Sequence, residues 1–167
     1  MPACRLWYTR RCGLTLVELV ATVAILAVLA SVVLPLSRMS AQRTREIELR
    51  RNLRIIRTAL DEYKKAYDQA VQDKKIIPST NKSGYPETLQ LLVDGQDFGG
   101  LYSYKRKFLR RIPVDPMTPR KAGEETRWGM RSYADRPDAP HWGGEDVYDV
   151  YSLSDAAAID GSRYREW

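Results

Sequence analysis

Glu18 is the residue of this sequence whose position most demands a chemical partner. It lies inside an apolar segment, residues 14–36, that carries no other charged side chain. A carboxylate within a membrane-spanning helix costs on the order of 2.5 to 3.5 kcal/mol at the helix centre and less near an end. We therefore expect Glu18 to pair with a cation. The alternative is that Glu18, close to the start of the segment, extends to the membrane surface and has no further role.

Catalytic constellations are missing from the rest of the sequence. The single histidine, His141, lies among Pro and Trp residues, and no nucleophile or acid pair is spaced from it as catalysis requires. There is no Gly-rich phosphate loop and no HExxH pattern. Cys4 and Cys12 both precede the apolar segment, so the chain beyond it can form neither a disulfide nor a cysteine zinc site. The sequence predicts a protein that works by assembly and contact, not as an enzyme.

The apolar segment that holds Glu18 is long enough to cross a membrane. Its 23 residues compare with the ~20 that cross ~30 Å of hydrocarbon as a helix, and they exceed the apolar core of an ordinary secretory signal. The prefix, residues 1–13, contains three arginines and no acid, so it should stay in the cytoplasm. We expect a single-pass protein whose remainder lies outside the cytoplasm. Pro35 either kinks this helix or marks its end.

An amphipathic helix is expected to continue over residues 37–71. Apolar residues recur there at helical spacing and form one stripe, which consists of Leu49, Leu53, Ile56, Leu60, Tyr63 and Tyr67. The stripe spans only about three heptads, so packing against a small sheet is favoured over a coiled coil.

Residues 72–167 predict a loop-rich head. Residues 85–92, begun by a proline turn, predict a short helix, and residues 131–133 and 147–153 alternate as strands do. Gly143 and Gly144 are turn residues in this interpretation. The expected fold class is α+β, with one long amino-terminal helix packed on a small antiparallel sheet.

Three features together resemble the signal of type IV prepilins. They are Gly13, the segment that begins Leu14-Thr15-Leu16-Val17-Glu18, and the short basic prefix. The resemblance implies that a prepilin peptidase cuts between Gly13 and Leu14 and methylates the new amino terminus, where the family most often has Phe. It also implies that Glu18 neutralises the amino terminus of a neighbouring subunit, and that Pro35 is a typical pilin-helix proline with a part in assembly.

A second set of motifs resembles the major pseudopilin of type II secretion systems. These motifs are a Tyr-Pro pair followed by leucines, the stretch FLRRIPVDP at residues 108–116, and a later Trp-Gly pair. The resemblance implies a homo-oligomeric periplasmic filament that drives protein export, with other pseudopilins and an inner-membrane assembly platform as partners. The alternatives are a type IV pilin or minor pilin for adhesion, motility or DNA uptake, and a binding domain on an uncleaved anchor.

The carboxyl-terminal segment resembles the calcium loop of major pseudopilins. By this resemblance Asp155, Asp160, Ser162 and the Leu153 carbonyl group would supply several of the six to eight oxygen ligands that Ca²⁺ requires. Three consecutive alanines replace the acid-rich centre of the family's loop. The alternative is a terminal turn in which Asp155 and Asp160 cap backbone groups without an ion.

The net charge of +6 does not by itself indicate nucleic acid. Three arginines precede the apolar segment, and seven more lie in residues 38–57, so much of the excess flanks the predicted membrane span. Glu46 and Glu48 interrupt the second group, which also lacks the interleaved aromatic residues of a single-strand binding surface. We expect lipid and protein partners and no nucleic acid.

Overall fold

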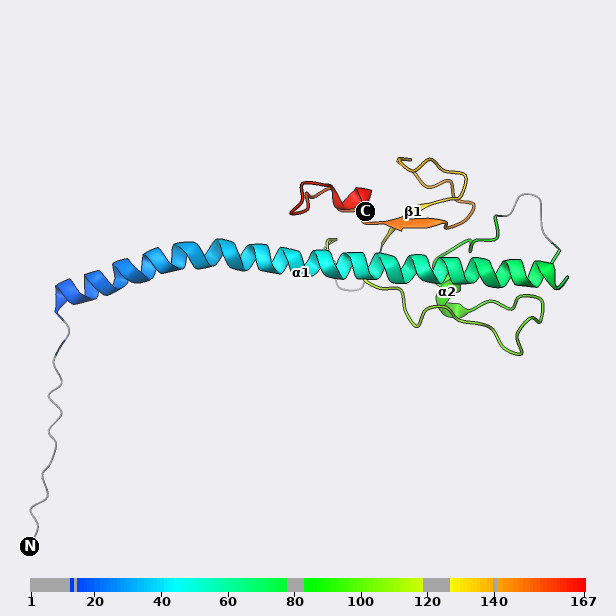
Figure 1. The fold of residues 1–167 in the computed structure, drawn as a ribbon, viewed down its shortest axis with the longest axis horizontal. Coiled ribbons are helices and arrows are strands. Elements are labelled where there is room, and N and C mark those ends of the chain that lie inside the picture. The colour runs from blue at the N-terminus through cyan, green and yellow to red at the C-terminus, as the bar shows by residue number, and fades with distance from the viewer. Residues whose placement is uncertain (1–12, 14, 78–82, 119–126, 140) are drawn as a thin grey trace, which may run out of the picture. The chain divides into compact units, whose positions relative to one another are not determined.

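One long helix, α1, runs over Leu16–Gln72 in the computed structural model (Figure 1). The chain divides into two units, Met1–Ser40 and Ala41–Trp167, and α1 contributes residues to both. Pro35 lies within α1, so the helix does not end there. The structure describes residue 13 and residues 15–77, 83–118, 127–139 and 141–167, with the backbone alone at 32–37.

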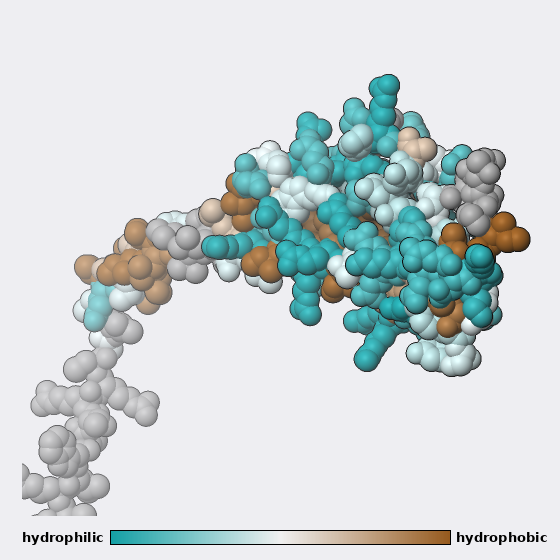
Figure 2. All heavy atoms as spheres, turned by 45° about the vertical axis from the view of Figure 1, so that its right-hand side comes forward, coloured by the Kyte–Doolittle hydropathy of each residue, from teal (hydrophilic) through white to brown (hydrophobic). Residues whose placement is uncertain are grey.

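In the first unit, the apolar side chains of α1 that the structure describes are exposed. Figure 2 shows them as a brown surface over the first turns of the helix, in contrast to the mostly teal face of the second unit. These side chains include Leu16, Val17, Leu19, Val20, Val23, Ile25, Leu26, Val28 and Leu29. Within the described residues, no helix meets the combined requirements of length and apolarity for a membrane span.

The second unit is built on the apolar stripe of α1. Leu49, Leu53, Ile56, Leu60 and Tyr63 are buried as predicted, whereas Tyr67 is only partly buried. Burial of one such aliphatic side chain contributes about 1.5 to 3 kcal/mol. The stripe packs in one core with side chains from the head, chiefly Leu92, Phe98, Trp128, Val147 and Val150. The stripe therefore serves the head, as expected, and not a coiled coil.

Two short strands, β1 (Gly129–Arg131) and β2 (Asp149–Tyr151), pair antiparallel, with Gly129 opposite Tyr151. The α+β class is confirmed. The first strand ends earlier than predicted because the amides of Ser132 and Tyr133 donate to the carboxylates of Asp135 and Asp146. Side chains thus satisfy the donors that a longer ladder would have used.

The short helix α2 spans Gln90–Asp94, so the prediction of a helix over residues 85–92 was wrong in its position. The reason lies at Pro86, whose carbonyl group accepts a hydrogen bond from the Val147 amide at 2.8 Å. That bond ties the segment before α2 to the segment before β2. A 3₁₀ turn, η1, follows at Tyr164–Glu166.

Candidate functional site

The predicted cleavage position, Gly13, is exposed, and its surroundings do not require glycine. A Cβ atom built there meets no described atom within 4 Å, and Gly13 is not among the positive-φ glycines. The fold therefore tolerates a side chain at this position. If glycine is required at residue 13, the requirement is set by the protein that recognises this segment. Residues 1–12, which make up the rest of the predicted leader, lie outside the described residues. The same holds for Leu14, the first residue after the predicted cleavage site.

Glu18 lies in the first turn of α1 and is exposed in this single chain. Its amide donates to Thr15 Oγ1 at 3.2 Å, and the Leu19 amide donates to the Thr15 carbonyl at 3.0 Å. Thr15 therefore caps the helix, and Thr-x-x-Glu is the sequence pattern of a capping box. A carboxylate in the first turn also interacts favourably with the helix dipole. Sequence reasoning missed this local role, although the spacing of Thr15 and Glu18 signals it.

The motif at residues 108–116 forms a joint between three parts of the head. The Asp115 side chain is buried and accepts from the Met117 amide at 2.8 Å, from Thr118 Oγ1 at 2.8 Å and from Ser152 Oγ at 2.7 Å. Three donors offset the cost of burying a carboxylate. Ser152 follows β2 directly, so the motif is fixed to the sheet.

Neighbouring carbonyl groups of the same motif extend this joint. Trp128 Nε1, just before β1, donates to the Pro113 carbonyl at 2.9 Å. Asn52 Nδ2 of α1 donates to the Val114 carbonyl at 2.9 Å. Consecutive residues 113, 114 and 115 thus bond in turn to the residue before β1, to α1 and to the residue after β2. Composition alone predicts only a rigid loop here; the structure explains why this loop contains these residues.

The two aspartates among the predicted calcium ligands each accept a hydrogen bond from a different arginine. Asp160 Oδ2 accepts from Arg50 Nη2 at 3.3 Å, and Asp155 Oδ1 accepts from Arg165 Nη1 at 3.4 Å. Asp160 Oδ1 accepts from the hydroxyl and the amide of Ser162, at 2.5 and 2.9 Å. These two bonds, with a smaller contribution from Arg50, hold the pKa of Asp160 below its ordinary value.

This arrangement does not fit a calcium cage. The oxygens of Asp160 hold N–H and O–H donors, and Ser162 Oγ itself accepts from Trp167 Nε1 at 2.8 Å. Within the described part of the chain, no three His, Cys, Asp or Glu side chains are grouped to hold a metal ion. Calcium binding stays a prediction from resemblance.

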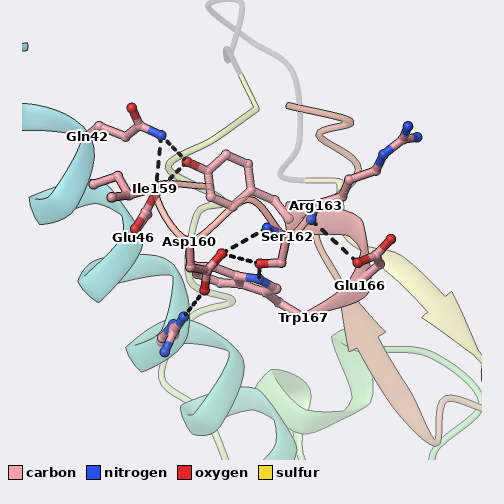
Figure 3. Close-up of polar contacts among 10 residues, drawn as sticks. Gln42, Glu46, Ile159, Asp160, Ser162, Arg163, Glu166 and Trp167 are labelled. Carbon is pink, nitrogen blue, oxygen red and sulfur yellow. Dashed lines mark hydrogen bonds and ion pairs between the residues drawn. The ribbon is translucent and has the colours of Figure 1, made fainter. Parts of the chain in front are cut away.

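Three polar side chains of α1 at four-residue spacing contact the carboxyl-terminal segment, and we call Gln42, Glu46 and Arg50 the polar stripe. Glu46 Oε1 accepts from the Ile159 amide at 2.9 Å and from the Tyr164 hydroxyl at 2.8 Å. Gln42 Nε2 donates to Tyr164 Oη at 2.9 Å and to the Ala157 carbonyl at 3.2 Å. Figure 3 shows Gln42 and Glu46 on α1 beside the carboxyl-terminal segment that carries Ile159, Asp160 and Trp167. Sequence reasoning missed the stripe, although one helix face at i, i+4 and i+8 was its signal.

A second arginine of α1, Arg57, fixes β2. It donates to Asp149 Oδ1 at 2.7 Å, to the Val150 carbonyl at 3.1 Å and to the Trp167 carbonyl at 2.7 Å. Arg131 of β1 donates to Asp149 Oδ2 at 3.2 Å, and its guanidinium carbon lies 4.2 Å from the centre of the Tyr151 ring. Part of the arginine excess therefore serves the fold.

Comparison with known protein families places the start of the chain in a described family. Residues 8–34 match the family described as the prokaryotic N-terminal methylation motif. The match covers Gly13, Leu14 and Glu18, whereas Pro35, the other residue expected to serve assembly, lies one position beyond it. No curated protein and no solved structure matches the chain significantly.

The motif match and the fold support the same class of protein. A methylation motif at the start of a long helix, followed by a head with a small antiparallel sheet, supports a type IV pilin-like protein. The motif implies processing by a prepilin peptidase, a membrane-anchored precursor and assembly into a filament.

Proposed function

We propose that this chain is a structural subunit of a type II secretion pseudopilus. The observation that carries the proposal is the methylation motif over residues 8–34, which includes Gly13, just before α1, and Glu18, in its first turn. The peptidase cuts between Gly13 and Leu14 and methylates Leu14. The processed chain then joins its copies and other pseudopilins in a periplasmic filament on an inner-membrane assembly platform.

The branch within the class rests on the motif at residues 108–116. Its aspartate, Asp115, is buried and joins the loop to β2, and Trp128 of the Trp-Gly pair donates to Pro113. The residues that resemble a major pseudopilin are thus residues that organise this head. This supports the secretion role over that of a type IV pilin or minor pilin.

The exposed apolar side chains at the start of α1 give the filament its physical basis. Such a surface is removed from water either by lipid or by the helices of other subunits. In the proposed topology the prefix is cytoplasmic and the head is periplasmic. The Glu18 carboxylate then meets the amino terminus of the next subunit, and pairing of the two charges fixes the register between subunits. The proposed role involves no catalysis.

The first test is the intact mass and amino-terminal sequence of the protein recovered from membranes that contain a prepilin peptidase. A chain that begins at methylated Leu14 supports the proposal, and a chain that retains residues 1–13 contradicts it. A second test separates the two branches. The chain is produced with a type II secretion platform or with a type IV pilus platform, and filaments are detected by electron microscopy. Filaments with the pilus platform alone would contradict the secretion role.

A further inference from the structure

Segment 155–167 lies against α1 through hydrogen bonds and an ion pair from three side chains of the helix. The polar stripe supplies one set: Glu46 holds the Ile159 amide and the Tyr164 hydroxyl, and Gln42 holds the Ala157 carbonyl. Arg50 supplies the other, through Asp160. We propose that the Arg50 guanidinium provides the positive charge for Asp160 and that segment 155–167 keeps its conformation on α1 without a divalent cation.

The first argument is the coordination of Asp160. One carboxylate oxygen accepts from Arg50 at 3.3 Å and the other accepts two donors from Ser162. A calcium ion needs carboxylate oxygens at 2.3 to 2.6 Å and several more oxygens around it. The second aspartate, Asp155, instead pairs with Arg165. Each of the two predicted acidic ligands is therefore paired with the positive charge of an arginine.

The second argument is that Arg50 is held on two sides. Its guanidinium carbon lies 4.1 Å from the centre of the Trp167 ring, and Trp167 Nε1 donates to Ser162 Oγ. Arg50, Asp160, Ser162 and Trp167 thus form a closed circuit of contacts. An isolated exposed ion pair stabilises little, but a cation–π contact and two linked hydrogen bonds orient this one.

The third argument is that backbone hydrogen bonds within the segment close it into a turn. The Ala158 amide donates to the Ser162 carbonyl at 2.8 Å, and the Gly161 amide donates to the Ala158 carbonyl at 3.0 Å. Gly161 has φ of 87°, which suits glycine at a tight turn. The backbone between Asp155 and Ser162, where a metal loop would need its carbonyl oxygens free, is partly committed to this turn.

The test uses the full-length protein in detergent and follows amide hydrogen exchange at Ile159 and Ser162, with thermal unfolding beside it. Each measurement is made with excess EDTA, with CaCl₂ and with neither. The variants are Arg50→Ala and the matched control Arg51→Ala, which removes the same charge from an exposed neighbouring position. Circular dichroism checks the fold, and Arg50→Lys, which keeps the charge but loses the planar fork, replaces Arg50→Ala should that variant not fold.

We expect EDTA and CaCl₂ to leave exchange and the unfolding temperature of the parent protein unchanged. Arg50→Ala should speed exchange at both amides by about fivefold, the factor that loss of an ordinary cation–π contact implies, while Arg51→Ala should leave it unchanged. Slower exchange or a higher unfolding temperature with CaCl₂, abolished by Asp160→Asn, would establish a calcium loop and overturn the proposal. Equal exchange in Arg50→Ala and the parent would overturn it as well. These readouts do not depend on processing or filament formation.

Discussion

The hydroxyl of Ser152 donates to the carboxylate of Asp115 at 2.7 Å, and both side chains are buried. This bond joins a loop residue to the residue that follows β2, 37 positions along the chain. We expect Asp115→Asn to lower the free energy of unfolding by about 1 to 3 kcal/mol, because the new amide group would meet donors that a carboxylate satisfied.

Chemical denaturation of the full-length protein in detergent measures this effect. Asp73→Asn is the matched control, since Asp73 is exposed just after α1. Ser152→Ala should show a smaller loss of the same sign, because one donor of three is removed. Equal stability of Asp115→Asn and Asp73→Asn would show that the joint at Asp115 does not stabilise the head.

Gly129→Ala should destabilise the pairing of β1 and β2. A Cβ atom at residue 129 would lie 2.3 Å from two carbon atoms of the Tyr151 ring directly opposite. Such overpacking costs roughly 1 to 3 kcal/mol. Thermal unfolding measures the loss. Tyr151 is itself buried, so the ring is tested in a double-mutant cycle: Gly129→Ala should cost less stability in a Tyr151→Ala background than in the parent, because the clashing ring is gone. An equal cost in both backgrounds would rule out the ring as the cause.

Asp135 should make the loop before β2 sensitive to acid. Its carboxylate accepts from the amides of Ser132 and Gly143 at 2.7 and 3.0 Å, and these bonds hold the pKa of Asp135 below its ordinary value. A pKa lowered in the folded state gives stability that is present above the unfolded value, about 3.9, and is lost as pH falls through the folded value.

The predicted loss of stability at acidic pH is measured by amide hydrogen exchange at Ser132 and Gly143 as the pH is lowered. Asp135→Asn should weaken protection at neutral pH and flatten its pH dependence. Asp138→Asn, at an exposed position nearby, should leave the pH dependence as it is. A steep acid transition that persists in Asp135→Asn would assign the effect to another group.

Gly13→Ala tests whether the glycine serves a recogniser and not the fold. Because a Cβ atom at residue 13 meets nothing described within 4 Å, we expect thermal unfolding to match that of the parent protein. We also expect cleavage by a prepilin peptidase to fall by at least about tenfold, since the enlarged residue crowds the extended peptide in the peptidase. Mass spectrometry after co-expression measures the processed fraction; unimpaired cleavage would remove Gly13 from the recognition signal.

Glu18→Leu should separate processing from assembly. We expect normal cleavage but loss of the variant from filaments, because the neighbouring amino terminus then has no carboxylate to pair with. Chemical crosslinking in membranes and electron microscopy measure incorporation. Glu18→Asp, which keeps the charge on a shorter side chain, should retain partial incorporation. Full incorporation of Glu18→Leu would show that Glu18 is not needed for assembly, and its role would then be limited to the first turn of α1.

The long helix and its buried stripe were predictable because both follow from local periodicity. The 3.6-residue repeat alone was enough to predict that the apolar stripe from Leu49 to Tyr63 lies in the core. The ends of α2 and β1 were misplaced because they depend on bonds between distant residues, such as the Val147 amide with the Pro86 carbonyl. The same holds for the polar stripe, whose partners lie more than a hundred positions away.

This separation between α1 and its partners also bears on the order in which the head is made. Glu46 is synthesised 118 positions before Tyr164, and Gln42 is 122 positions before it. Until residue 164 has been translated, the helix lacks the groups that complete its polar contacts. Folding of the head therefore finishes only after the segment around Tyr164 has been made, and closure of such long loops makes it slow compared with helix formation.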